Sequence, residues 1–127
     1  MKTKHFLKAC LYLCVAVLFA SCGKNNVASY IPDLAAEFKN MASTPDNDSY
    51  FFNAVEPSAF ESDFNGNEAL NFSTVYTFSG SYQNTKIHFK FTSGPKTGTT
   101  YSGTISGAGY NTIITLNTPT GKIVLTR

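Results

Sequence analysis

Apolar and polar residues alternate along most of the chain after residue 49. The clearest case is KIHFKF at residues 86–91, where Ile87, Phe89 and Phe91 are separated by lysine or histidine. Successive side chains of a β-strand point to opposite faces, so this pattern predicts a strand with one buried and one solvated face. Tyr101, Gly103 and Ile105 alternate with serine and threonine in the same way. We expect six strands, or seven with a short one at 60–64; the others cover 50–55, 70–78, 85–91, 99–106, 112–117 and 122–127.

Short segments rich in glycine, asparagine, serine and proline separate these strands. Their length and composition favour hairpins between antiparallel neighbours, and no helical pattern lies between any two strands. The predicted arrangement is therefore an antiparallel meander. The predicted turns contain Asn65-Gly66, Ser79-Gly80, and residues 93–98, 107–109 and 119–121.

The segment that precedes the strands has a different periodicity. Its apolar residues recur at helical spacing, and Pro32 and Asp33 are residues typical of a first helical turn. We expect one short helix over residues 31–41, ending before Pro45. The apolar positions on which this depends are Ile31, Leu34, Ala35, Phe38 and Met41.

The first 21 residues have the features of a secretion signal. Three lysines, at positions 2, 4 and 8, precede an apolar stretch at residues 9–20. An apolar stretch of this length is typical of a cleaved signal and is too short to span a bilayer. Small residues, Ala20 and Ser21, precede Cys22. Two interpretations of this segment stay open beside the one given next: an ordinary secretory signal with an incidental cysteine, and a transmembrane anchor.

The run Phe19-Ala20-Ser21-Cys22 resembles the lipobox of bacterial lipoproteins, although Phe19 replaces the usual leucine. The resemblance implies cleavage before Cys22 and a lipid on its sulfur, followed by a polar tether at 22–28 and one domain at 29–127. Cys10 and Cys14 would leave with the signal, and acylation of Cys22 would then leave no free thiol in an oxidising compartment. The tether has no acidic run, which favours an outer-membrane position facing the periplasm.

Removal of the signal changes the charge of the chain. The net charge of the whole sequence is +2, but without the three signal lysines seven basic residues face eight acidic ones. Residues 22–68 contain all the acidic residues, whereas residues 69–127 contain five basic residues and no acidic one. One interpretation is a basic binding face; the favoured one is that the two halves interleave in one fold. The balance of charge gives no indication of a nucleic-acid partner.

The run KIHFKFTSGPKTGTTYSGTISGAGYNTIITLNTPTGKIVLTR, residues 86–127, resembles the second half of small lipocalin-like lipoproteins of the Bacteroides group. The shared features are a glycine-rich turn, a Thr-Tyr-x-Gly-x-Ile strand and a closing Leu-Thr-Arg. The resemblance implies a mainly β fold, an up-and-down barrel with a helix at one end. Because roughly 106 residues after the signal are few for eight strands, a partly open barrel or a small sandwich is the alternative.

Residues that carry catalysis or bind metals are scarce. His88 is the only histidine after the signal and falls between two lysines on a predicted solvent face. Catalysis by a serine and a histidine needs a third group to orient the base, and zinc needs three or four ligands. The acidic stretches at 46–48 and 63–68 lack EF-hand spacing, and the glycines at 103–109 lie between strands rather than before a helix. We therefore expect no enzyme, no metal and no cofactor.

Two functions stay open for a non-catalytic lipoprotein of the cell envelope. The barrel could hold a small hydrophobic ligand, with Gly103 leaving space inside; alternatively, the protein is an accessory lipoprotein that docks on an envelope protein complex. A sizeable cavity favours the first function, whereas a barrel filled by its own aromatic side chains favours the second. The candidate ligand-lining residues are Phe72, Tyr76, Phe78, Ile87, Phe89, Phe91, Tyr101, Gly103 and Ile105.

Overall fold

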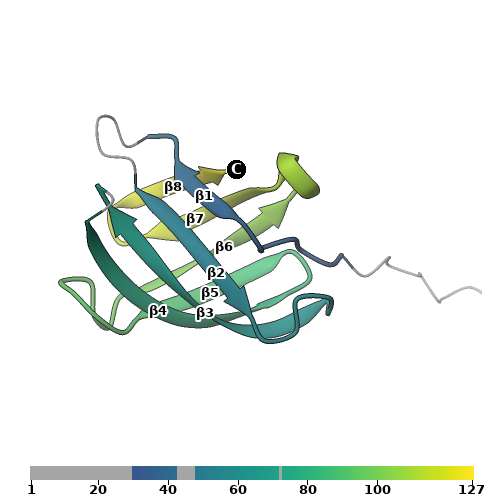
Figure 1. Ribbon diagram of the computed structural model, residues 1–127, viewed down its shortest axis with the longest axis horizontal. Coiled ribbons are helices and arrows are strands. Elements are labelled where there is room, and N and C mark those ends of the chain that lie inside the picture. The colour runs from purple at the N-terminus through teal and green to yellow at the C-terminus, as the bar shows by residue number, and fades with distance from the viewer. Residues whose placement is uncertain (1–29, 43–47, 72) are drawn as a thin grey trace, which may run out of the picture.

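The computed structural model describes residues 30–42, 48–71 and 73–127, which form a closed antiparallel β-barrel (Figure 1). Each strand pairs with its neighbours in sequence, and β1 pairs with β8 to close the barrel. This confirms the predicted mainly β meander and decides for a closed barrel over a partly open one. None of the helical segments in the described residues is long and apolar enough to cross a membrane. The elements are β1 (Glu37–Asn40), β2 (Ser49–Ala54), β3 (Glu61–Leu70), β4 (Thr74–Gln83), β5 (Lys86–Phe91), β6 (Thr100–Ser106), the 3-10 turn η1 (Gly109–Asn111), β7 (Ile113–Thr118) and β8 (Gly121–Thr126).

The helix expected over residues 31–41 is wrong. Residues 30–36 contain no helix, and the next four form β1. In β1, Glu37 pairs with Phe51 of β2 and Lys39 pairs with Thr126 of β8. Without β1, β2 and β8 would each have an unpaired edge, so hydrogen bonding to two neighbouring strands outweighs the local helical spacing.

Two of the predicted turns lie inside long strands. Asn65-Gly66 belongs to β3 and Ser79-Gly80 belongs to β4, and both strands curve strongly around the barrel (Figure 1). A Cβ atom on Gly66 would meet the ring of Phe78, and one on Gly80 would meet Phe89. These glycines therefore allow close packing within the barrel wall rather than a reversal of the chain.

The chain reversals that follow β3 and β4 each contain an asparagine in the left-handed conformation. Asn71 follows β3 and Asn84 follows β4, with φ angles of 48° and 51°. Asparagine tolerates this left-handed region better than most residues other than glycine. The N–H of Ser73 donates to the carbonyl of Leu70 and closes the first of these turns. The strand predicted at 70–78 therefore spans a hairpin turn.

The order of hairpins places the loops at two ends of the barrel. We call one the proximal end: it consists of residues 30–36, the β2–β3 loop (55–60), the β4–β5 turn and the β6–β7 loop (107–112). The Tyr30 hydroxyl donates to the carbonyl of Gly107 (2.7 Å), and Leu34 is buried here. The opposite, distal end carries the β3–β4 turn, the β5–β6 loop (92–99) and the β7–β8 turn (Figure 1).

The two oppositely charged halves of the sequence interleave in the barrel. Lys96 Nζ lies 2.7 Å from a carboxylate oxygen of Glu68, and Arg127 Nη1 lies 2.9 Å from one of Asp33. Each pair joins an acidic residue of the first half to a basic residue of the second. The interleaving interpretation of the charge pattern therefore holds for both of these pairs.

Candidate functional site

The side chains expected to line a ligand cavity pack against one another. Ile87, Phe89 and Phe91 are 2% exposed or less, and Phe78 and Ile105 are 1% exposed. The ring centroids of Phe78 and Phe89 lie 4.3 Å apart. A space wide enough for a ligand would also admit water and leave its lining accessible, so these values describe a filled interior.

The remaining candidates are distributed around this core. Tyr101 is 7% exposed, and its ring centroid lies 5.5 Å from that of Phe89. Tyr76 is half-buried and packs against the core, and Phe72 lies outside the described residues. The described candidates, apart from Gly103, thus belong to the filled core or pack against it, which is the alternative to a cavity that the sequence left open.

Gly103 does not leave the space expected of it. It lies in β6 in register with Leu116 of β7, and a Cβ atom there would meet the backbone carbonyl of Thr115. The same atom would lie 2.9 Å from the Cα of Leu116. The glycine therefore serves the close approach of two strands and not a ligand.

We expect Gly103→Leu to destabilise the protein by about 3 kcal/mol, the upper part of the range for overpacked cores, because backbone cannot yield as a flexible side chain can. Urea unfolding of the full chain measures this change. Ser102→Leu, at the exposed neighbouring position, is the control and should change the free energy of unfolding by about 0.5 kcal/mol or less. A Gly103→Leu variant as stable as the wild type would show that the barrel has room at this point.

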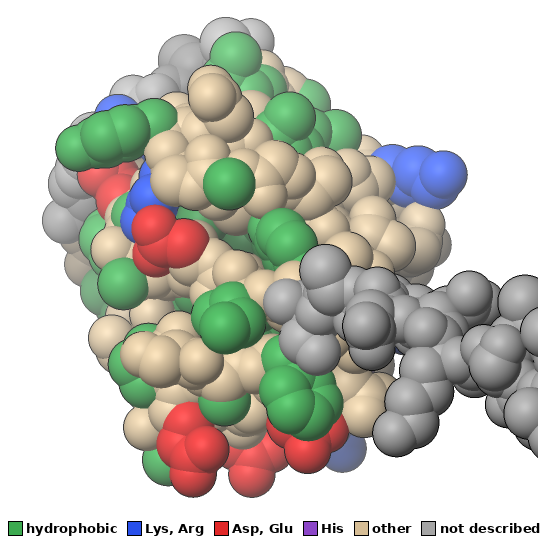
Figure 2. Space-filling view, turned by 90° about the vertical axis from the view of Figure 1, so that its right-hand side faces the viewer, with side chains coloured by type: hydrophobic (Ala, Val, Ile, Leu, Met, Phe, Trp, Pro, Cys, Tyr) green, Lys and Arg blue, Asp and Glu red, His purple; other side chains and the backbone are tan. Residues whose placement is uncertain are grey.

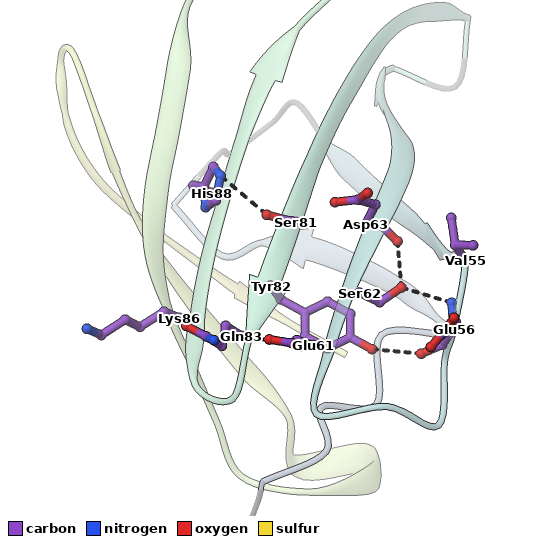
Figure 3. Close-up of a pocket in the computed structure, with 10 residues that line it drawn as sticks. All are labelled: Val55, Glu56, Glu61, Ser62, Asp63, Ser81, Tyr82, Gln83, Lys86 and His88. Carbon is purple, nitrogen blue, oxygen red and sulfur yellow. Dashed lines mark hydrogen bonds between the residues drawn. The ribbon is translucent and has the colours of Figure 1, made fainter.

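The outer wall carries a groove of about 590 Å³ near the proximal end, where His88 lies (Figure 3). Asp63, Ser81 and His88 form one row across β3, β4 and β5, and Ser81 Oγ lies 3.3 Å from His88 Nε2. Figure 3 shows Ser81 between the other two side chains, so the carboxylate of Asp63 is on the wrong side to orient the imidazole. The described residues contain no group of three or more histidine, cysteine or acidic side chains placed to hold a metal ion.

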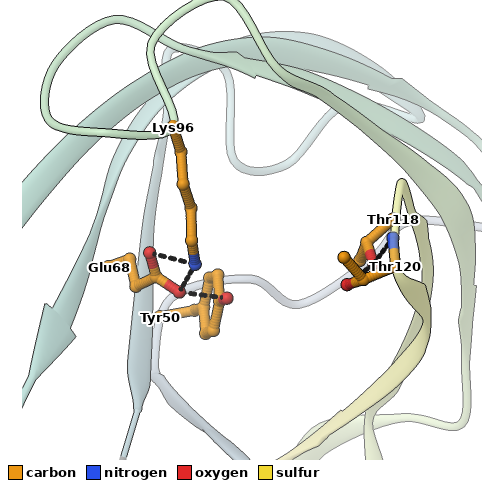
Figure 4. A network of polar contacts seen from close by, with 5 residues as sticks. All are labelled: Tyr50, Glu68, Lys96, Thr118 and Thr120. Atoms are coloured by element: carbon orange, nitrogen blue, oxygen red, sulfur yellow. Dashed lines mark hydrogen bonds and ion pairs between the residues drawn. The ribbon is translucent and has the colours of Figure 1, made fainter.

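A second group of polar side chains lies inside the barrel at the distal end (Figure 4). Glu68, near the end of β3, points inward and is fully buried. Tyr50 of β2 is its register partner and donates its hydroxyl proton to Glu68 Oε1. Lys96 extends from the β5–β6 loop and donates to both carboxylate oxygens, at 2.7 and 2.9 Å. We call Tyr50, Glu68 and Lys96 the distal cluster.

Two aromatic rings complete the surroundings of the Lys96 ammonium group. Its nitrogen lies 5.4 Å from the ring centroid of Phe91 and 5.9 Å from that of Tyr101. Both distances suit cation–π contacts. A carboxylate and two rings thus hold the ammonium group, while the Lys96 side chain as a whole is 33% exposed.

The backbone of the β5–β6 loop is held independently of the distal cluster. Thr97 N–H donates to the carbonyl of Gly94 at 3.1 Å, and Gly98 N–H donates to that of Phe91 at 2.9 Å. Gly94 and Gly98 have φ angles of 76° and 85°, where a residue with a side chain is strained. The loop therefore presents Lys96 on a defined turn.

The surroundings of Lys96 and Tyr50 favour the protonated form of each side chain. Burial by itself lowers the pKa of Lys96, but the hydrogen bond and the negative charge of Glu68 outweigh this, so the pKa is raised above its ordinary value. Burial, and then the charge of Glu68, raise the pKa of Tyr50 far above its usual range. Lys96 thus stays a cation and Tyr50 stays a donor, an arrangement suited to binding rather than to proton transfer.

Sequence reasoning did not single out the distal cluster. The available signal was an acidic residue at an inward position of β3, two residues beyond Gly66 and four beyond the buried Phe64. The turn predicted at Asn65-Gly66 broke that strand in two and concealed the alternation. The partner Lys96 lies 28 residues away, in a segment predicted only as a loop.

Comparisons with known proteins return no family model, no curated relative and no solved structure that matches this chain. The interpretation of the site therefore depends on its own geometry.

Proposed function

We propose that the protein is a non-catalytic lipoprotein of the bacterial cell envelope, anchored through a lipid on Cys22, that docks on an envelope protein complex. The observation that carries the choice of docking over carriage is the filled barrel interior. Phe78, Phe89 and Ile105 are nearly inaccessible, so a hydrophobic ligand would have to displace packed side chains. A partner would then contact the outer surface of the barrel.

The proximal end is the part of the barrel that an anchor would hold near the membrane. Eight residue steps join Cys22 to Tyr30, a span of at most about 28 Å when fully extended. Figure 2 looks onto this end and shows hydrophobic side chains exposed at several places among polar ones. Such side chains suit the interfacial region of a bilayer. Those on the segments of the proximal end are Ile31, Val55, Phe60 and Tyr110.

An apolar patch on the side wall supports a protein partner. Met41, Ile113 and Val124 are exposed on or beside β1, β7 and β8. The N–H of Met41 donates to the carbonyl of Val124 at 3.3 Å. Ile113 pairs with Thr126, two residues along β8 from Val124, so Ile113 and Val124 lie diagonally on the same face. We call these three residues the side patch. A group of exposed aliphatic side chains on one wall suits docking on another protein.

Site-specific photo-cross-linking tests this proposal in the cells that make the protein. A photoreactive phenylalanine analogue at Val124 should yield an adduct with one other envelope protein, because the side chain would lie in the interface. The matched control places the same analogue at Lys90, an exposed position on β5, and should yield no such adduct.

Identical adducts at both positions, or none at either, would exclude docking through the side patch. If native mass spectrometry of the unmodified protein also showed a retained hydrophobic molecule, carriage would replace docking as the proposed function.

A further inference from the structure

The carboxylate of Glu68 needs a cation beside it. It is fully buried, and its hydrogen-bond donors in the distal cluster are the Tyr50 hydroxyl and the Lys96 ammonium group. Tyr50 satisfies one oxygen lone pair but supplies no charge. A buried carboxylate left without its positive partner is strongly destabilising. The interior of the distal end is therefore built around a positive group.

The surroundings of that positive group match an ammonium ion in particular. The nitrogen of Lys96 contacts both carboxylate oxygens and lies within cation–π distance of the Phe91 and Tyr101 rings. A carboxylate combined with aromatic rings is a means by which proteins bind ligand ammonium groups. Nothing in this set requires that the ammonium group belong to the protein.

The groups that form this set lie on or at the ends of paired strands, whereas the ammonium group comes from a loop on a long side chain. Tyr50 and Glu68 lie on strands that are paired on both sides, and Tyr101 lies on β6. Lys96 comes from a loop whose backbone hydrogen bonds do not involve its side chain. A lysine stem is flexible and the Lys96 side chain is 33% exposed, so rotation of the stem would carry the ammonium group to water while the loop stays in place.

From this geometry we propose that the distal cluster is a binding site for an organic cation with a primary ammonium group, and that Lys96 is a built-in occupant that the ligand displaces. The ligand ammonium group takes the position of Lys96 Nζ, and the rest of the ligand projects from the distal end. This site is separate from the side patch, and it depends neither on the lipid on Cys22 nor on a docking partner.

The first test uses the full chain, purified in a non-ionic detergent, with Lys96→Ala to empty the site. Propylammonium chloride is the probe because it restores the three carbons and the ammonium group that the substitution removes. We expect a saturable rise in melting temperature, with a Kd on the order of millimolar for so small a ligand. Sodium chloride at equal ionic strength and 1-propanol are the controls for charge screening and for apolar contact.

Two variants localise the effect. Lys90→Ala removes an exposed lysine of β5 but keeps Lys96, so it should respond as the wild type does, with a rise that needs more propylammonium than in Lys96→Ala. Glu68→Gln combined with Lys96→Ala should lose the rise, because the carboxylate charge is gone. The proposal is overturned if Lys96→Ala shows no saturable effect, or if the effect is equal in either of these variants.

The second test asks whether the wild-type lysine gives way. Nuclear magnetic resonance of the lysine side-chain carbons should show the Lys96 signal moving towards that of exposed Lys90 as propylammonium is added. Saturation should need more ligand than in Lys96→Ala, since a tethered group competes at a millimolar effective concentration. A Lys96 signal that stays unchanged at one hundred times the Kd of Lys96→Ala would show a permanent structural ion pair and overturn the proposal.

Discussion

Replacing Cys22 with serine should release the protein from its membrane or leave it as an uncleaved precursor. Serine has no sulfur to carry the diacylglycerol, and the resemblance to a lipobox implies that cleavage before residue 22 depends on that lipid. Two or three acyl chains anchor a protein stably, at about 0.8 kcal/mol for each buried methylene, so their loss should remove the membrane association of any chain from which the signal has been cleaved. Fractionation of cells and intact mass of the mature chain measure the result.

Ser21→Ala is the matched control, because it changes the neighbouring residue and keeps a small side chain before the cysteine. It should leave acylation and membrane association as they are in the wild type. Wild-type protein in the soluble fraction, with residues 1–21 removed and the Cys22 thiol unmodified, would falsify the lipid anchor.

Loss of Lys96 and loss of Glu68, the two partners of the ion pair at the distal end, should lower the stability of the protein by different amounts. Lys96→Met should destabilise the protein by about 3 kcal/mol, because it leaves the carboxylate of Glu68 fully buried without a cation. Glu68→Gln should cost less, about 1 to 2 kcal/mol, because the partly exposed Lys96 can turn its ammonium group to water. The double variant should recover most of the larger loss. Urea unfolding of the four proteins measures these differences.

The loss of stability in Lys96→Met should depend on pH if its origin is electrostatic. The pKa of Lys96 is raised in the folded protein above the ordinary value of 10.5, so its contribution is complete below that pH and is lost as the pH rises through the folded pKa. The difference in the free energy of unfolding between the wild type and Lys96→Met should therefore be constant near neutral pH and narrow as the pH rises above 10.5. Lys90→Met should change stability by about 0.5 kcal/mol or less. A constant gap up to pH 11 would point to lost packing of the lysine stem instead.

The strand faces were predictable because alternation is a local property. In β5 the sequence KIHFKF places Ile87, Phe89 and Phe91 on one side, and the barrel buries these three while leaving both lysines and His88 exposed. Any register with the neighbouring strands preserves that division, since successive side chains point to opposite faces. Prediction of buried residues in this part of the chain therefore did not depend on knowing the topology.

Local signals failed where two different causes produce the same residue pattern. Leu34 and Phe38 lie four residues apart, as on one face of a helix, yet both are buried with Phe38 in a strand. Gly66 and Gly80 follow polar residues, as in a hairpin turn, yet each accommodates an aromatic ring or a backbone from a neighbouring strand. Which cause applies depends on partners distant in the sequence.

By itself, the sequence determined a mainly β antiparallel meander and the buried faces of β5 and β6, because alternation and hairpin-forming residues act over a few positions. The prediction of a lipid on Cys22 also depends on local residues alone. Tertiary structure decided the closure of the barrel through β1 and β8, the filling of its interior and the ion pair between Glu68 and Lys96. Those features depend on strand register and on contacts between segments far apart in the chain, which no local pattern encodes.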